Sequence, residues 1–142
     1  MVYVITLIKI RRRKPLSNLL FWIYLINAVL LISHEIDSAY WKEWKLFKLP
    51  GGITGFLLIH FPLLFLILYG LVLIYEKAFS GLIISLLLSF GGIFAFFIHT
   101  YFIKKGNEEF KTAISMFILI ATFIISLIQL IITIVIIFMN IQ

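Results

Sequence analysis

The chain has 142 residues, of which 63% are hydrophobic and only 13% are charged, and its mean hydropathy is +1.18. So little polar surface excludes a soluble globular protein and indicates a single membrane domain over residues 1–142. The absence of cysteine excludes disulfides, thiolate zinc sites and Cys-ligated iron–sulfur clusters. The net charge of +6 comes from short basic clusters beside apolar stretches, which favours a lipid bilayer as partner and not nucleic acid.

The first segment, residues 1–16, is apolar at its start and basic at its end. Its apolar part is too short to cross a hydrocarbon layer of ~30 Å. Pro15 and Ser17 together are typical of a helix start. We therefore expect an interfacial basic segment, followed by the first membrane helix.

Four further stretches are each apolar over the ~20 residues that a helix needs to cross a bilayer. Helices are required because lipid offers no partners to an open backbone, and the pattern does not alternate as barrel strands would. The short Glu76-Lys77 connection predicts an antiparallel hairpin. The sequence therefore predicts an all-α integral membrane protein, an antiparallel four-helix transmembrane bundle. Its transmembrane helices are expected at about residues 17–39, 52–75, 79–103 and 113–139.

The connections give the expected orientation. Lysines and arginines divide evenly between the two sides, but the compact basic block from Arg11 to Lys14 precedes the first helix. That block favours a cytoplasmic N-terminus in a multi-pass protein, because the first helix usually dominates. The connection from Trp41 to Gly52 is rich in aromatic residues and is expected in the outer head-group region. Glu108 and Glu109 are interpreted as a solvated loop face.

Small and hydroxyl side chains form stripes at helical spacing, which is typical of helix packing in lipid. His99 falls on the stripe of the third apolar stretch, and His34 shares a face with Asn27 on the first. Both histidines are therefore expected to point inward. The two stripes consist of Gly81, Ser85, Ser89, Gly92, Phe96 and His99, and of Ser115, Thr122, Ser126, Gln129 and Thr133.

The three histidines of the chain lie near the same end of three different helices. At a rise of ~1.5 Å per residue, His34, His60 and His99 are expected roughly 8 to 13 Å inside the outer boundary. Ionisable groups inside a membrane are costly and usually functional. Glu35 and Asp37 flank His34, and one of them is expected to join it. The sequence thus predicts an intramembrane histidine and carboxylate site near the outer face.

Three chemistries fit such a site. Imidazoles and carboxylates are the ligands that a divalent metal such as Zn²⁺ requires when cysteine is absent. A histidine paired with an acid could instead serve as a base or proton relay, and two histidines could ligate haem axially. The plain alternative is that each histidine only forms hydrogen bonds within the bundle. The candidate metal ligands are His34, His60, His99, Glu35 and Asp37.

The position of His60 has the weakest support in the sequence. No polar stripe gives its direction, so its place depends on its depth and on nearby Pro62. A proline inside a membrane helix frees the carbonyl four residues earlier and often accompanies a cavity.

The segment from His34 to Trp44, with the later residues 49–52 and His60, resembles a group of small four-helix membrane proteins. It is similar to the HXXEE-motif membrane proteins, whose first helix carries a histidine and paired acids. The acids here are Glu35 and Asp37, not a glutamate pair three residues after the histidine. The resemblance implies an intramembrane site of histidine and acid residues and names no reaction.

Two functions from different classes follow. The first is a small membrane protein with a metal-binding site near its outer face, acting on a lipid-soluble substrate that enters between the helices. The alternative is a non-catalytic subunit or scaffold, packed in a homo-oligomer or against a larger membrane partner. A proton-coupled carrier is less favoured, because four short helices would have to dimerise to enclose a pathway.

Overall fold

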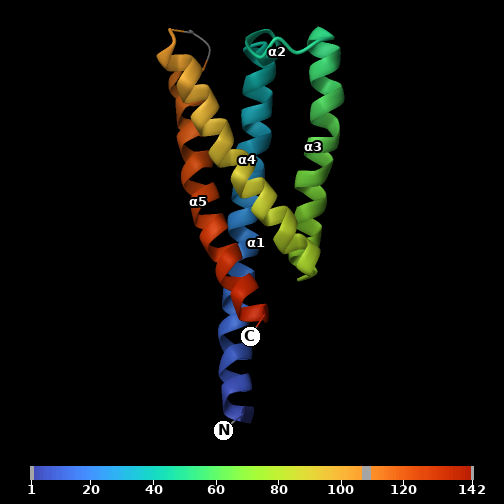
Figure 1. Ribbon diagram of the computed structural model, residues 1–142, viewed down its shortest axis with the longest axis vertical. Coiled ribbons are helices and arrows are strands. Elements are labelled where there is room, and N and C mark those ends of the chain that lie inside the picture. The colour runs from blue at the N-terminus through green and yellow to red at the C-terminus, as the bar shows by residue number, and fades with distance from the viewer. Residues whose placement is uncertain (1, 107–109, 142) are drawn as a thin grey trace.

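The computed structural model describes residues 2–106 and 110–141, with side chains described for 15–106 and 110–140. The described chain is helical, which confirms the predicted all-α class. Glu108 and Glu109 lie outside the described residues. The helices are α1 (Val2–Tyr40), α2 (Glu43–Leu46), α3 (Gly52–Tyr75), α4 (Phe79–Lys104) and α5 (Ala113–Ile141) (Figure 1).

The long helices alternate in direction along the chain. In Figure 1, α1 and α4 run toward the end that carries α2, and α3 and α5 run away from it. α5 packs against α1 and α4, and α3 packs against the same two helices from the other side. α3 and α4 meet at their short connection and diverge toward the α2 end (Figure 1).

Four helices are long and apolar enough to cross a membrane, as predicted. The described spans are Pro15–Tyr40, Gly52–Tyr75, Phe79–Lys104 and Ala113–Asn140. Large apolar side chains such as Trp22, Phe61 and Phe94 are exposed on the outside of the bundle. Such a surface suits lipid and is unusual in water. Together these features indicate a multi-pass membrane protein.

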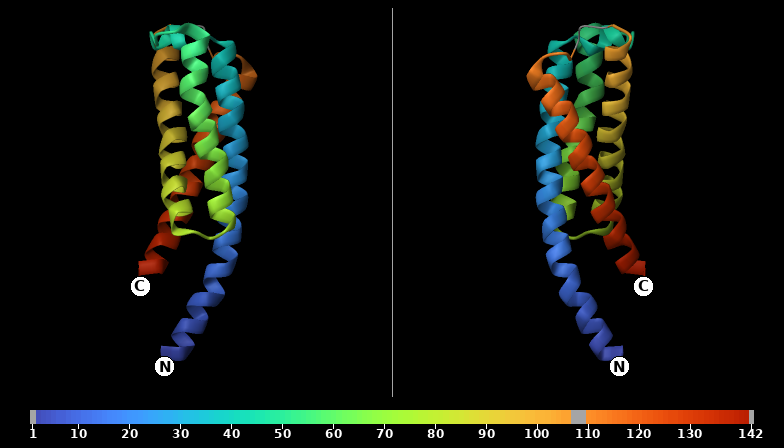
Figure 2. Two further views of the ribbon diagram at one scale, coloured as in Figure 1. Left: turned by 90° about the vertical axis from the view of Figure 1, so that its right-hand side faces the viewer. Right: turned by 90° about the vertical axis from the view of Figure 1, so that its left-hand side faces the viewer.

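The first helix differs from the expectation. α1 is continuous from Val2 and passes through Pro15 without a break, although Pro15 and Ser17 predict a helix start there. A proline removes a single amide donor from the helix ladder, and the remaining hydrogen bonds continue on either side. The early part of α1 therefore extends past the other helices as a projecting, curved helix (Figure 2).

The predicted polar stripes face the interior. The stripe residues Ser85, Ser126, Gln129 and Thr133 are buried, as is Asn27 on α1. Asn27 Nδ2 donates to Gln129 Oε1 at 2.8 Å, and Gln129 Nε2 donates to Ser85 Oγ at 3.0 Å. We call these five residues the central network. It joins α1, α4 and α5 at mid-bundle.

Candidate functional site

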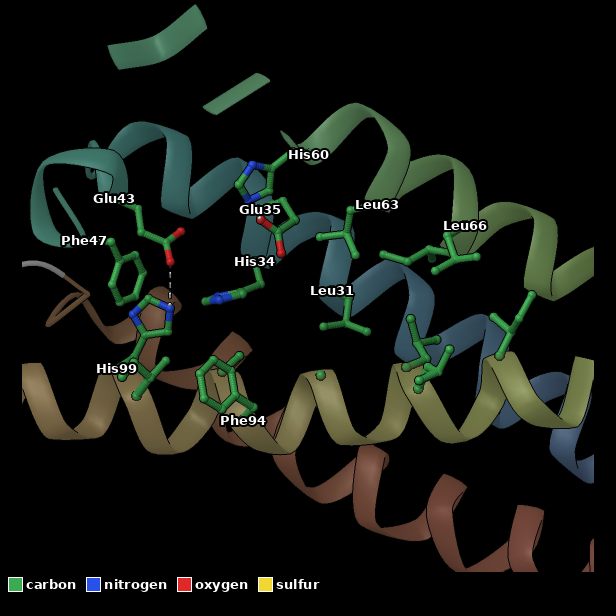
Figure 3. A pocket seen from close by; sticks show the side chains of 17 residues that line it. Leu31, His34, Glu35, Glu43, Phe47, His60, Leu63, Leu66, Phe94 and His99 are labelled. Carbon is green, nitrogen blue, oxygen red and sulfur yellow. Dashed lines mark ion pairs between the residues drawn. The ribbon is translucent and has the colours of Figure 1, made fainter. Parts of the chain in front are cut away.

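A cavity of about 300 Å³ lies beneath α2, between α1, α3 and α4 (Figure 3). Its end nearest α2 carries ionisable side chains, and the rest of its wall is apolar. We call this group the His/Glu cluster. It consists of His34, Glu35, Glu43, His60 and His99.

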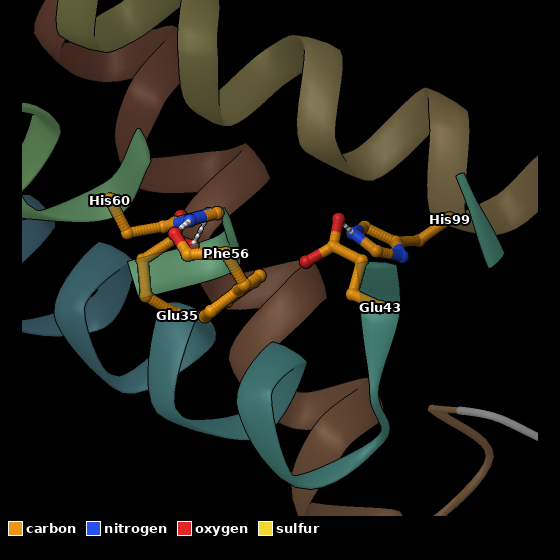
Figure 4. Close-up of polar contacts among 5 residues, drawn as sticks. All are labelled: Glu35, Glu43, Phe56, His60 and His99. Carbon is orange, nitrogen blue, oxygen red and sulfur yellow. Dashed lines mark hydrogen bonds and ion pairs between the residues drawn. The ribbon is translucent and has the colours of Figure 1, made fainter. Parts of the chain in front are cut away.

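The helices α1, α2, α3 and α4 all contribute to the His/Glu cluster, and a tight turn positions α2. Lys42 adopts a left-handed backbone conformation with φ 55°, which is uncommon for a residue other than glycine. This turn folds α2 back over the end of the bundle. As a result, the carboxylate of Glu43 reaches the cavity from above, opposite His99 of α4 (Figure 4).

Glu35 and His60 form the closest ionisable pair of the cluster. His60 Nε2 lies 2.8 Å from Glu35 Oε2, and His60 Nδ1 lies 2.7 Å from the carbonyl oxygen of Phe56 (Figure 4). A carbonyl can only accept, so Nδ1 carries a hydrogen and Nε2 faces the carboxylate. The Phe56 ring also stacks on the imidazole. The Phe56 carbonyl and ring together fix the orientation and the plane of the His60 imidazole.

Glu43 is held beside His99 on the other side of the cavity. His99 Nε2 lies 3.5 Å from Glu43 Oε1, and the His34 and His99 rings are T-shaped to each other, with centroids 4.8 Å apart. Burial raises the pKa of Glu43, and the nearby Ser38 and His60 only partly oppose this rise. A charged Glu43 is therefore costly unless a cation balances it.

Three members of the cluster converge as a metal site requires. Glu35, Glu43 and His60 each offer one ligand atom, and these atoms lie within 4.8 Å of one another. Two ligands of one ion at about 2.1 Å are at most about 4.2 Å apart. Side-chain rotations that move the atoms by less than about 1 Å would bring all three onto a single ion.

The family comparison covers most of the chain. A model of a family of unknown function, DUF6713, matches residues 20–136. The chain belongs to the DUF6713 family. The matched residues include the whole His/Glu cluster, and nothing in the DUF6713 match ties the chain to the HXXEE-motif proteins. Searches of curated proteins and of solved structures found no match.

Of the predicted metal ligands in this DUF6713 protein, all but Asp37 line the cavity. Asp37 lies on the other side of α1, where Ser115 Oγ donates to its Oδ1 at 3.0 Å. Thr112 Oγ1 accepts from the Ser115 amide at the start of α5, so the carboxylate lies near a helix N-terminus, which favours negative charge. The structure therefore brings Glu35 to the cluster and leaves Asp37 as a contact between α1 and α5.

Sequence reasoning missed Glu43. The connection from Trp41 to Gly52 looked like an amphipathic turn in the head-group region, and its lysines outnumber its acids. The available signal was that Glu43 is the single acidic residue of this connection. A lone acid among cations is more often a surface charge, so this signal would not have been specific.

Proposed function

We propose that this DUF6713 protein binds a divalent metal ion, of the Zn²⁺, Fe²⁺ or Mn²⁺ type, through Glu35, Glu43 and His60. The observation that carries the proposal is the convergence of these three ligand atoms within 4.8 Å. Supporting it, His60 already has the second contact that metal-binding histidines use, since its Nδ1 meets the Phe56 carbonyl. The other ring nitrogen of His60, Nε2, then points toward the proposed position of the ion.

Charge balance supports an ion in this position. Two carboxylates close together in apolar surroundings repel each other when both are charged, and unpaired charges are costly there. A divalent cation neutralises both at once. Mixed carboxylate and imidazole ligands suit zinc and other first-row metals. His99 Nε2 lies 3.5 Å from Glu43 Oε1 and would orient the Glu43 carboxylate as an outer contact of the metal site.

Such a site would keep an open coordination position. Three protein ligands leave room for water or for a substrate oxygen, as in catalytic zinc sites. An ion held this way acts as a Lewis acid, which polarises the bound oxygen or lowers the pKa of bound water. The cavity beside the cluster is where that oxygen would lie.

The proposal includes a membrane topology. We propose an antiparallel transmembrane bundle with a cytoplasmic N-terminus, which places the cluster near the outer face. Four apolar helices of spanning length support insertion. The basic residues from Arg11 to Lys14 support the orientation.

Metal analysis tests the proposal. The protein is reconstituted in phosphatidylcholine nanodiscs, incubated with Zn²⁺ and desalted, and its zinc content is measured by mass spectrometry. We expect a stoichiometric ion in the wild type and in Asp37→Asn, the matched acid outside the cluster. We expect loss of the ion in Glu35→Gln, Glu43→Gln and His60→Ala. A folded wild type without zinc, or full retention by the three variants, would contradict the proposal.

A further inference from the structure

The cavity extends well beyond the His/Glu cluster as an apolar slot between α3 and α4. Leu63 and Leu66 line it from α3, and Phe94 lines it from α4 (Figure 3). Ile84 and Leu87 also line it from α4. The lining residues on α4 reach from His99 back to Ile84, which is about 22 Å along a helix. One end of the cavity is thus polar and ionisable, and its long remainder is hydrocarbon.

The slot opens sideways, toward the surface that faces lipid. α3 and α4 diverge toward the α2 end (Figure 1). Among the residues that line the slot, Leu66 is 37% exposed, Leu87 56% and Phe94 66%. The same side chains therefore face both the cavity and the outside of the bundle. A molecule dissolved in the bilayer could enter here without crossing water.

Gly91 keeps the middle of the slot open. An added Cβ at Gly70, Gly81 or Gly92 would collide with a neighbouring helix, so close packing explains those three glycines. A Cβ at Gly91 would meet nothing within 4 Å, and Gly91 lines the cavity together with Ala95 one turn later. Close helix packing does not explain Gly91. Together with Ala95 it leaves a depression in the cavity wall where a hydrocarbon chain could lie.

We propose that the cavity binds a single-chain lipid with an uncharged oxygen head group, such as a long-chain alcohol, aldehyde or ester. The chain lies in the slot, and the head group oxygen meets the ion at the His/Glu cluster. A volume of about 300 Å³ is at the lower end of the range for ligand pockets, which favours one chain over the two of a phospholipid.

The choice of head group rests on the proposed metal ion, whereas the binding of the chain rests on the slot alone. Glu35 and Glu43 together balance a divalent cation, so the loaded site has no net charge to offer an anion. None of the residues that line the cavity is lysine or arginine, the groups that would pair with a phosphate. An uncharged oxygen avoids burying an unpaired charge.

Photo-crosslinking tests the inference on the zinc-loaded protein in phosphatidylcholine nanodiscs. The probe is a long-chain primary alcohol with a diazirine on its chain, and labelled peptides are mapped by mass spectrometry. We expect labelling on the slot walls of α3 and α4. Excess unlabelled alcohol should abolish it, whereas lysophosphatidate of equal chain length should not. Labelling spread evenly over the lipid-facing surface, or insensitive to the alcohol, would overturn the inference. Equal competition by lysophosphatidate would overturn the choice of head group.

Two variants locate the chain. Gly91→Leu fills the slot and should lower its labelling at least about fivefold. Ser80→Leu places the same side chain at an exposed position of α4 that does not line the cavity, and should leave the labelling unchanged. Equal labelling of wild type and a folded Gly91→Leu protein would contradict the inference. If Gly91→Leu does not fold, the competition experiment on the wild type decides.

Zinc content measured on the same samples separates the two proposals. Bound zinc without slot labelling contradicts the lipid inference and leaves the metal site supported. Slot labelling that Gly91→Leu removes, in a protein without zinc, supports chain binding and contradicts both the metal site and the head group derived from it.

Discussion

Among the described residues, the central network and the His/Glu cluster are two groups of buried or half-buried polar side chains that differ in kind. In the central network, uncharged groups pair across helices, as in the 2.8 Å contact between the Ser85 and Thr133 hydroxyls, and Gly92 packs tightly against Ser126. In the His/Glu cluster, ionisable groups surround open space. Neutral groups that satisfy one another are typical of helix association in lipid, whereas ionisable groups beside a cavity are typical of sites. Burial and polarity alone therefore do not distinguish a packing contact from a candidate site in this protein.

The largest expected effect is on metal affinity, which substitutions in the His/Glu cluster should lower and substitutions in the central network should not. Glu35→Gln should weaken Zn²⁺ binding by more than about 100-fold, because losing a ligand costs more than losing an outer contact. Gln129→Leu, in the central network, should leave the affinity unchanged. Competition with a chromophoric chelator measures both. If Gln129→Leu weakened binding as much as Glu35→Gln, the two regions would not be functionally distinct.

The free energy of unfolding, unlike the metal affinity, should depend on the central network. Gln129→Leu removes the side-chain amide that bonds Asn27, the Ser85 hydroxyl and the Ser85 carbonyl. At about 0.6 kcal/mol for each hydrogen bond in a membrane protein, the free energy of unfolding should fall by about 2 kcal/mol. Unfolding in detergent mixtures by steric trapping measures this change. Ile131→Ala, at a position 62% exposed on the same helix, is the control and should have little effect.

Two neighbouring glycines on α4 differ in the same way, since Gly92 is packed and Gly91 meets open space. Gly92→Ala places a methyl group against the Ser126 side chain and should lower the free energy of unfolding by about 1 to 2 kcal/mol. Gly91→Ala meets open space and should leave it unchanged or raise it by up to about 1 kcal/mol, because alanine favours helix. The same unfolding measurement applies to both. Equal losses would show that the region beside Gly91 is packed and not open.

The smallest effect concerns the acid that stays outside the cluster. Asp37→Asn should lower the free energy of unfolding by about 0.5 kcal/mol, because it removes a negative charge near the N-terminus of α5. Zinc affinity should not change. A loss of zinc in this variant would place Asp37 among the ligands and contradict its position beside Ser115.

Much of the fold was predictable because lipid imposes strict rules on length and hydropathy. The second predicted helix, 52–75, agrees with α3 (Gly52–Tyr75) in both bounds. The helical rise also placed His34, His60 and His99 at one level, and all three line the same cavity. α1 was less predictable at its start, because a helix can continue through Pro15 at the loss of one hydrogen bond.

The details of the cluster depended on tertiary structure. Glu35 and Asp37 lie on opposite flanks of His34, and only the positions of α3 and α5 decide which acid enters the cavity. Glu43 reaches the cluster through the turn at Lys42, whose left-handed conformation no hydrophobic pattern encodes. Local sequence therefore predicted the end of the bundle at which the three histidines meet, but not which acids lie beside them.

X-ray absorption spectroscopy at the zinc edge tests the metal site most directly. For the zinc-loaded wild type, we expect nitrogen and oxygen ligands around the zinc, with the outer scattering of one imidazole. His60→Ala should lose the bound zinc and with it the imidazole signal, whereas His34→Ala should keep both. A wild-type spectrum of fully hydrated zinc, or an imidazole signal that survives His60→Ala, would contradict the assignment of Glu35, Glu43 and His60 as the ligands.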